Sequence, residues 1–431
     1  MNKTIVLRVL EMKNLALLIV AVLCISCNKK ITTELSRKMI PLDSENSVPD
    51  DFSKLDQFIE SKEIILLGEA AHGEGKTFEV KTQIVKYLVE KKGFNTIALE
   101  GMDFLQLEYI NGRSVLKNNL ADNFESDWYG YWNPWNPAKQ LMPFETFIKS
   151  KKISLVGIES YQKITAIINI DFIKNELEKS NWSSLNKDQW EKLSPIFDKI
   201  QNNEKPLTIA EYDFFTLQLQ RIIESNETIF FGDNFFTQML ENLITHVSME
   251  FNPKTFSNED EESAYRVRTR DYQMARNLIY FKERNPKAKI IVWLANFHGA
   301  TNLKEVTFAD GDPEMYSKFT VFGEHIKNKY SDKVYSIATT STRGFSKMPY
   351  NKGVEETKII APKESLEFEL DKRKFNFGYI DFREIYKKNP EKRDEIFNSI
   401  MLGHYNQKGK WLQLFDGLLY IKENEIALPK G

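Results

Sequence analysis

The chain has 431 residues, of which 42% are hydrophobic and 13% aromatic, so it carries more apolar material than a disordered segment leaves in water. Its 59 Lys and Arg nearly balance its 61 Asp and Glu, which excludes the basic field that holds a nucleic-acid backbone. The two Cys, Cys24 and Cys27, exclude a disulfide framework and a Cys-based zinc or redox site in the body of the chain.

The first 26 residues have the pattern of a bacterial lipoprotein signal peptide. Basic residues precede an unbroken apolar run from Leu15 to Ile25, and the small Ser26 precedes Cys27. The run is shorter than the ~20 residues that a membrane-spanning helix needs. We therefore expect a lipid anchor on Cys27 and a place in the bacterial cell envelope, at the outer membrane or periplasmic face.

Residues 27–51 are polar and lack periodicity, which predicts a tether ahead of a folded body over residues 52–431. In this body short apolar runs alternate with amphipathic stretches, which predicts an α/β fold with a parallel or mixed central sheet flanked by helices. Residues 164–251 show helical periodicity and no convincing strand, so we expect an α-helical insertion there. The predicted strands are 63–67, 95–99, 153–158, 289–294, 334–338, 375–380 and 418–421, and the main helices are 77–92, 263–284 and 315–330.

Acidic and His residues follow four of these strands at the point where each strand ends. Glu69 and His72 follow the first strand, Glu100 the second, Glu159 the third and His298 the fourth. Because the carboxyl ends of parallel strands form the ligand crevice of an open α/β sheet, we expect these five side chains to share one edge.

Other sequence patterns are weaker. The stretch AAHGEGKT at residues 70–77 nearly matches the phosphate-binding loop, but Ala70 stands where the first Gly belongs, and the neighbouring acids would repel phosphates. The chain has no GxSxG and no HExxH motif. No acidic companion pattern accompanies the remaining His residues, which we interpret as structural: His246, His325 and His404.

Five segments resemble the erythromycin esterase family. LLGEAAHGEGKTFEVK followed by GFNTIALEG is similar to the opening of the family. The resemblance continues through Arg270-Asp271 with MAxN after it, VWLANFHGA, and the closing FDGLLY, and it covers roughly Phe52 to Leu428.

This resemblance implies hydrolysis of carboxylic esters without a serine nucleophile and without a cofactor. The named members open the macrolactone ring of erythromycin-type antibiotics, a form of macrolide resistance, so a small-molecule ester is the implied substrate. By position, Glu69, His72, Glu100 and His298 correspond to functional residues of the family pattern.

Two positions depart from the family pattern. Lys81 stands where the family often has Arg, and Lys supplies positive charge without a bidentate fork. Ala295 stands where the family has His, so a titratable group is missing. Both departures weigh against macrolide hydrolysis more than against hydrolytic chemistry in general.

A chemical scheme follows from these residue types. A neutral His72 accepts a proton from the attacking water, Glu69 or Glu100 orients its imidazole, and the nearby helix N-terminus favours the neutral form. His298 donates a proton to the leaving alkoxide or polarises the carbonyl, and Lys81 stabilises the oxyanion.

Two alternatives use the same side chains. Glu69, His72, Glu100 and His298 also suit a divalent metal ion that activates water. The other alternative is a lipoprotein that binds haem or a metal ion in the crevice without turnover, since related folds include metal-dependent proteases and haem-binding envelope lipoproteins.

Further residues have both a functional and a structural interpretation. The Trp-rich segment that contains Trp132 and Trp135 either walls the substrate, together with Glu159, or packs over the sheet. We interpret Arg270 and Asp271 as a structural ion pair or helix-end contact.

Overall fold

The structure, a computed structural model, describes residues 31–42, 48–111, 132, 135–151, 153–160, 163–179, 184–225, 234–309, 316–349, 353 and 355–430. The predicted signal peptide and Cys27 lie outside these residues. Within them, no helix is both long enough and apolar enough to cross a membrane.

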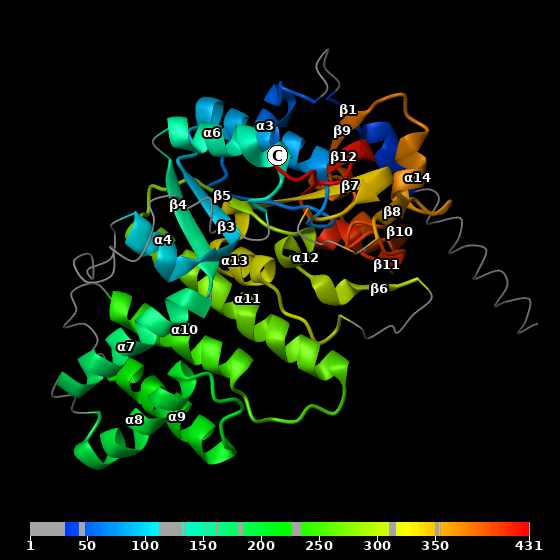
Figure 1. Ribbon diagram of the computed structural model, residues 1–431. Coiled ribbons are helices and arrows are strands. Elements are labelled where there is room, and N and C mark those ends of the chain that lie inside the picture. Colours follow the sequence, from blue (N-terminus) through cyan, green and yellow to red (C-terminus); the bar gives the residue numbers. More distant parts are fainter. Residues whose placement is uncertain are drawn as a thin grey trace, which may run out of the picture.

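A nine-stranded sheet forms the centre of the molecule (Figure 1). Its strands are β1 (Ile40–Pro41), β2 (Ile64–Leu67), β3 (Thr96–Asp103), β4 (Ser154–Glu159), β5 (Ile290–Trp293), β7 (Val334–Ser346), β8 (Thr357–Ile360), β9 (Phe377–Asp381) and β12 (Gly417–Asn424). The order is β1-β9-β12-β7-β2-β5-β3-β4, and β8 pairs with β7. Strands β12, β7, β2, β5, β3 and β4 run parallel, whereas β9, β1 and β8 pair antiparallel. The predicted α/β fold with a mixed sheet is confirmed.

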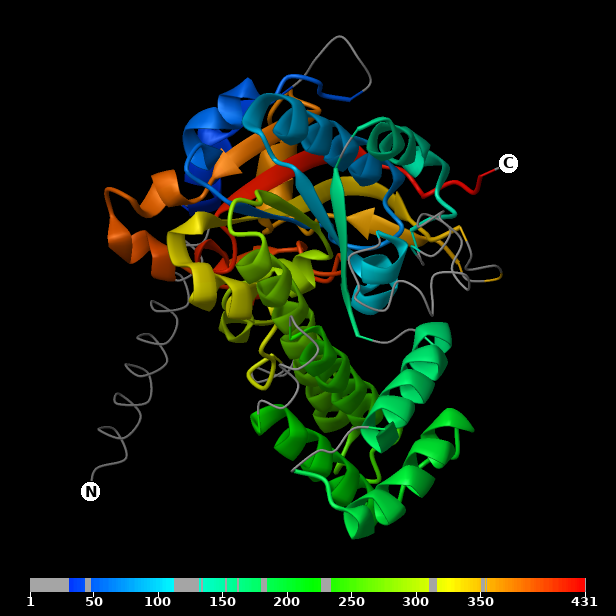
Figure 2. The same cartoon turned by 90° about the vertical axis from the view of Figure 1, so that its left-hand side faces the viewer.

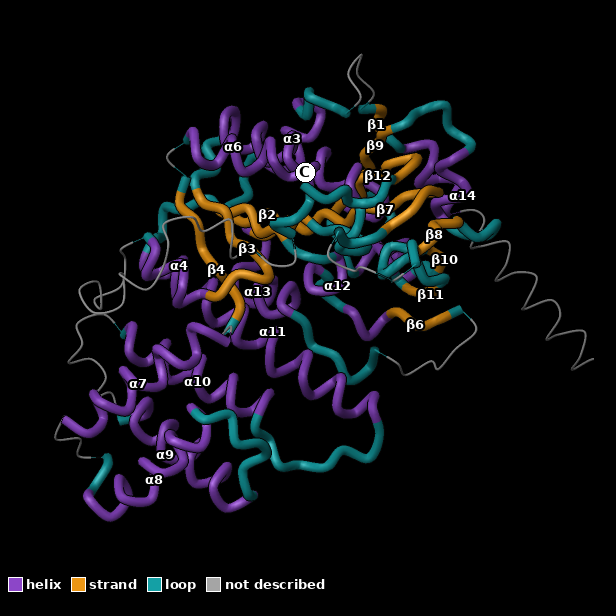
Figure 3. Tube along the Cα trace, viewed as in Figure 1, coloured by secondary structure: helices purple, strands orange, loops and turns teal. Residues whose placement is uncertain are grey.

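Helices cover both faces of this sheet because its central strands are apolar on both sides. Ile65 and Leu67 pack under α3 (Gly75–Lys92) and α6 (Met142–Ser150), and Ile64 and Leu66 pack on the side of α11 (Glu259–Arg284) and α13 (Phe322–Tyr330). Figure 3 shows these two layers above and below the strands. The shorter helices are α2 (Asp56–Ile59), α4 (Phe104–Ile110), α12 (Asn296–Gly299), α14 (Leu366–Asp371) and α15 (Arg383–Tyr386), and a small antiparallel sheet joins β10 (Phe397–Ser399), β11 (Gln407–Gly409) and β6 (Val306–Phe308).

The described residues of the insertion between β4 and α11 form helices joined by loops, without a strand. It contains α7 (Lys163–Lys179), α8 (Lys187–Gln201), α9 (Ile209–Glu224) and α10 (Phe235–Glu250). Capping boxes start α8 at Asn186 and α9 at Thr208, which explains why these boundaries are sharp. Figure 2 shows the insertion as a separate half below the sheet, with α11 running from it to the strands.

The predicted polar tether differs from the structure at residues 31–42. Residues 31–38 are helical, and Ile40 pairs with Tyr379 of β9. The side chains of Ile31 and Leu35 are 1% and 0% exposed. Apolar residues four positions apart form a narrow stripe on one face of the helix, and this stripe packs on the body. The charged residues between them make the stripe hard to recognise in the sequence. The folded body therefore begins at Ile31 or earlier rather than at residue 52.

Candidate active site

The loop after β2 brings the first two candidate residues to the edge of the sheet. Gly68 ends the strand, and a Cβ there would lie 2.1 Å from Oδ1 of Asn296, so only Gly allows the two segments to approach. The N–H of Asn296 donates to the carbonyl of Glu69 over 2.7 Å. The strand-end segments that carry Glu69 and His298 are therefore joined through their backbones.

The Glu69 carboxylate is fully buried and receives three donors. Its Oε1 accepts from Nε1 of Trp135 at 2.7 Å and from Nδ1 of His72 at 2.9 Å. Its Oε2 accepts from Nζ of Lys81 at 2.5 Å. Both Glu69 and Lys81 have 0% side-chain exposure, so this carboxylate is fixed in position.

The two ring nitrogens of His72 differ in their contacts, because one is hydrogen-bonded and the other, among the described residues, is not. Because Nδ1 donates to Glu69, the lone pair lies on Nε2, which is 4.0 Å from Oε1 of Glu100. The side chain keeps 36% of its surface exposed. Burial alone would lower the pKa of His72, but the hydrogen bond to Glu69 and the charges of Glu100 and Glu69 outweigh it and raise the pKa above 6.5. The carboxylates therefore have a larger effect than the helix N-terminus, opposite to the expectation.

Glu100 lies within β3 rather than at its end. The pairing of β3 with β4 shifts between Leu99 and Asp103, and this irregularity places the Glu100 carboxylate against the next strand, where Oε2 accepts from the N–H of Ala295 at 2.7 Å. Burial opposes ionisation of Glu100. The imidazoles of His298 and His72, the guanidinium of Arg270 and the N–H of Ala295 nevertheless lower its pKa to about 2. Glu100 is thus a carboxylate at every physiological pH.

Arg270 joins the remaining groups from α11. Its Nε donates to Oε2 of Glu159 at 3.0 Å, and its Nη2 donates to Oε1 of Glu159 and, at 3.2 Å, to Oε1 of Glu100. Its Nη1 lies 2.9 Å from Nε2 of His298. Burial opposes this charge, but Glu159 and Glu100 raise the pKa of Arg270. The sequence interpretation as a structural ion pair missed this central position.

The contact with Arg270 determines the protonation of His298. Arginine nitrogens only donate, so Nε2 of His298 must accept, and the ring proton must be on Nδ1. Nδ1 then donates to Oδ2 of Asp271 at 2.7 Å, an oxygen that also accepts the N–H of Phe322 at 2.8 Å. Both nitrogens of His298 are therefore engaged by protein groups, which differs from its predicted role as a proton donor to the leaving group.

Lys81 does not reach the position predicted for it. Its Nζ bonds Glu69 and the carbonyl of Leu294, at 3.3 Å, and lies 4.1 Å from the ring centre of Trp293. Burial lowers the pKa of Lys81 against the opposing effect of Glu69. A fully buried ammonium cannot meet a substrate oxyanion, so Lys81 holds Glu69 instead.

The three residues predicted to bind substrate also lie behind the site. Trp132 and Trp135 are 0% and 1% exposed and stack at 5.6 Å between ring centres. Their N–H groups donate to the backbone carbonyl of Glu100 and to the carboxylate of Glu69. Glu159 is 7% exposed and paired with Arg270. These groups support the polar cluster and do not wall the substrate. The rest of the predicted Trp-rich wall, including Trp128, lies outside the described residues.

Comparison with known proteins agrees with the motifs. The sequence profile described as "Erythromycin esterase" matches residues 217–424, which include α11 and the segment of His298. A protein of Bacillus subtilis (strain 168), named "Putative hydrolase YbfO", is 21% identical over 437 residues, covering 90% of each chain. Over residues 217–424 the chain is thus similar to the erythromycin esterase family.

Solved structures with the same fold include an erythromycin esterase. A variant of the erythromycin esterase EreC in its open conformation has a TM-score of 0.58 at 14% identity, over 86% of this chain and 93% of that one. A protein from Bacillus cereus has a TM-score of 0.69 at 19% identity, and a succinoglycan biosynthesis protein 0.68 at 18%. Each of these two matches covers 94% of this chain and 99% of the other. At these low identities, the structural matches show a shared fold.

The contacts within the cluster weigh against the predicted metal alternative. The structure brings Glu69, His72, Glu100 and His298 together, but nowhere in the described part of the chain could three or more His, Cys, Asp or Glu side chains hold a metal ion. Lys81, Arg270 and N–H donors already bind three of these groups, and the cations repel a metal ion. Of the four ring nitrogens of His72 and His298, Nε2 of His72 is the one for which the described residues show no hydrogen bond.

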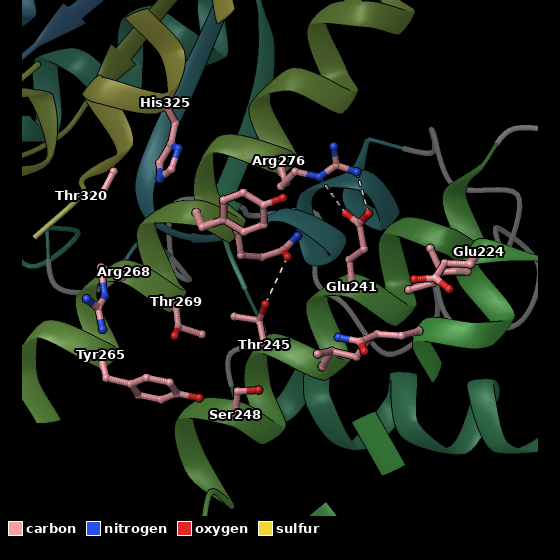
Figure 4. A pocket seen from close by; sticks show the side chains of 15 residues that line it. Glu224, Glu241, Thr245, Ser248, Tyr265, Arg268, Thr269, Arg276, Thr320 and His325 are labelled. Carbon is pink, nitrogen blue, oxygen red and sulfur yellow. Dashed lines mark hydrogen bonds and ion pairs between the residues drawn. The ribbon is translucent and has the colours of Figure 1, made fainter. Parts of the chain in front are cut away.

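A hollow of about 920 Å³ lies elsewhere on the molecule, on another face of α11 (Figure 4). Its α11 residues include Arg268, Tyr272 and Arg276, whose four-residue spacing puts them on a face that excludes Arg270. The ion pair of Arg276 with Glu241 crosses its wall. None of the clustered carboxylates or imidazoles lines it, so this hollow is not the reaction site.

Proposed function

We propose that this protein hydrolyses carboxylic esters with water activated by His72. The observation that carries the proposal is the asymmetry of this imidazole. Its Nδ1–H is held by a buried carboxylate, while its Nε2 lies 4.0 Å from Glu100 in a side chain that is 36% exposed. A general base needs this combination of a fixed orientation and a free lone pair.

The reaction follows from this geometry. A water molecule at Nε2 of His72 gives up a proton to the ring as its oxygen bonds to the ester carbonyl carbon, and a tetrahedral intermediate forms. Glu69 and Glu100 stabilise the resulting imidazolium. The same proton then passes from Nε2 to the leaving alkoxide as the carbon–oxygen bond breaks, which yields acid and alcohol and restores the neutral ring.

Arg270 supplies the donor for the developing oxyanion in this scheme. A guanidinium has five N–H bonds, and Glu159, Glu100 and His298 accept four of them. The remaining N–H is on Nη1, and Oδ1 of Asp271, the carboxylate oxygen paired with this nitrogen, is 4.0 Å away, beyond hydrogen-bond distance. The Arg270 side chain is 26% exposed, and its Nη2 contacts the Glu100 oxygen that lies 4.0 Å from Nε2 of His72, so the guanidinium is close to the base and we assign the remaining N–H to the oxyanion. His298 and Asp271 then act as positioning residues for the guanidinium.

The comparisons support an ester substrate without identifying it. The EreC relative is an erythromycin esterase and another structural neighbour is named for succinoglycan biosynthesis, so macrolides and acylated saccharides both belong in a test beside simple esters. Lys81 and Ala295 depart from the family pattern near the site. We therefore place simple or saccharide carboxylic esters ahead of macrolides.

A single panel tests this proposal. Purified protein is incubated with erythromycin, p-nitrophenyl butyrate and a succinylated oligosaccharide, with and without EDTA, and hydrolysis is followed by mass spectrometry and absorbance. We expect EDTA-insensitive hydrolysis of at least one ester that His72→Gln abolishes. Absence of all hydrolysis, together with a Soret band on titration with haem, would instead support the binding lipoprotein.

We also propose that the protein is anchored to a membrane of the cell envelope through Cys27. The signal pattern before Cys27 supports this proposal, and the helical residues from Ile31 onward pack on the body. Only residues 28–30 would then separate the anchor from the folded domain. The enzyme would act on esters close to the membrane surface.

A further inference from the structure

The loop that carries His72 is held by three segments from the C-terminal part of the chain. Gly403 donates its N–H to the carbonyl of Ala70 at 3.0 Å, and both Lys347 and Ala427 donate to the carbonyl of Gly73, at 3.0 and 2.9 Å. A Cβ on Gly73 would lie 2.4 Å from the nitrogen of Lys347. The backbone on both sides of His72 is therefore fixed by distant segments.

A buried carboxylate adds a side-chain contact to these backbone hydrogen bonds. Glu74, two residues after His72, has 1% side-chain exposure, and its Oε1 lies 2.7 Å from Nε2 of His404, whose side chain is 2% exposed. Its other oxygen accepts the N–H of Ala71 at 3.4 Å. The contact with His404 is close but off the hydrogen-bonding direction, so it acts through charge and shape. Glu74 thus links the His72 loop to His404.

The backbone at His404 is adapted to this contact. His404 has a φ of 64°, in the left-handed region that L-residues seldom adopt, and it follows Gly403 with a φ of 67°. These two residues turn the chain so that the N–H of one and the imidazole of the other both meet the His72 loop. An uncommon conformation at a buried polar contact beside a reactive group indicates a positional requirement.

We propose that His404 is a positioning residue that acts through Glu74 to hold the imidazole of His72 in line with Glu69 and Glu100. The inference rests on the proposed function, in which His72 is the base. It also explains why the chain keeps a buried ionisable pair, which is costly to desolvate and contributes less to stability than to a unique geometry. His404, interpreted from the sequence as lacking an acidic companion, has one from a distant segment.

The test measures the His72 ring and the reaction separately. Protein labelled with ¹⁵N in its histidines gives a signal for the Nδ1–H of His72, assigned by its loss in His72→Gln. In His404→Ala we expect this signal to broaden or disappear, and kcat to fall at least ~10-fold with KM within twofold, as for loss of a group that orients a reactive side chain. His404→Gln, which keeps a polar side chain of similar reach, should restore part of both.

Matched variants complete the test. Glu74→Gln should reproduce the loss in His404→Ala, and the double variant should lose no more than either single one, because both act through one contact. His325→Ala, on α13 outside the site, should change neither readout. If His404→Ala does not fold, His404→Gln and Glu74→Gln carry the test. An unchanged His72 signal and unchanged kcat in the folded variants would overturn the inference. A wild-type protein that hydrolyses no ester would refute the proposed function, while the His72 signal would still decide this inference.

Discussion

Replacing Arg270 by Met removes the one cation that contacts Glu100, Glu159 and His298 together. The Met side chain retains much of the volume and none of the five donors. Glu100 and Glu159 are then left buried without their common partner, which is the costly way to break a buried ion pair. The change should therefore lower both the thermal stability and the rate of hydrolysis, each for a different reason.

The stability loss is estimated from the buried contacts. Removing one partner of such a network costs about 3 kcal/mol, the lower end of the usual range because the Arg270 side chain is 26% exposed. With an unfolding entropy of roughly 2.1 cal/mol/K for each of about 400 residues, this corresponds to a fall of about 4 °C in the thermal midpoint. The protein should stay folded.

The kinetic loss should be larger. Removing one oxyanion donor costs about 10²- to 10³-fold in kcat. Loss of the Nη1 donor in Arg270→Met should therefore lower kcat at least ~100-fold on any ester that the wild type hydrolyses. Arg270→Lys should keep most of the stability and little of the activity, because an ammonium cannot meet three acceptors in a plane.

Arg276→Met is the matched control on the same helix. Arg276 also makes a two-point pair with a carboxylate, Glu241, but its side chain is 41% exposed and it lies on another face of α11. Such a surface pair is worth about 0–1 kcal/mol, so the thermal midpoint should fall by about 1 °C or less and kcat should not change. Ester hydrolysis by Arg270→Met within threefold of Arg276→Met, with both proteins folded, would refute the assignment of Arg270 to the site.

Three further predictions follow from the same geometry. His72→Gln should lower kcat at least ~10²-fold while the thermal midpoint stays within about 2 °C, and a variant with near wild-type turnover would exclude His72 as the base. His72 acts as a base only when it is deprotonated and its pKa is raised, so kcat/KM should rise with pH with a midpoint above 6.5. Glu100, with a pKa of about 2, should add no further step between pH 5 and 9. A midpoint at or below 6.5 would contradict the assignment of His72. Detergent-phase partitioning in Triton X-114 should move from the detergent to the aqueous phase in Cys27→Ser, and equal partitioning would contradict a lipid anchor.

The fold was predictable where the apolar pattern was strong. Four residues of continuous Ile and Leu at Ile64–Leu67 and of Ile, Val and Trp at Ile290–Trp293 admit little besides buried parallel strands. Helix α13 shows the limit, because the expected helix over 315–330 begins only at Phe322, and residues 316–321 form a turn and an extended segment instead. The helical stripe of Ile31 and Leu35 was missed because much of the cluster it packs in, including Leu366 and Ile380, lies more than 300 residues away.

The site was predictable in its membership at the strand ends but not in its internal pairing. Glu69, His72 and Glu100 come together because parallel strands must end at one edge. Which cation pairs with which carboxylate depends on α11, a helix whose face toward the sheet cannot be deduced from strand ends. Arg270 was therefore assigned to structure, while Lys81, two turns inside α3 and completely buried, was assigned to catalysis.

The charges of the cluster favour a proton on His72. Four carboxylates, Glu69, Glu100, Glu159 and Asp271, face two fixed cations, so with neutral imidazoles the cluster carries a formal charge of −2. Both ring nitrogens of His298 already contact protein groups, whereas Nε2 of His72 lies 4.0 Å from Glu100, so the proton from water is assigned to His72. A proton on its Nε2 reduces the unbalanced charge to −1, so the cluster stabilises the imidazolium that water activation creates more than it stabilises the resting ring. Binding the charge of the transition state better than that of the ground state is what accelerates a reaction, and in the proposed mechanism the buried carboxylates would supply that difference.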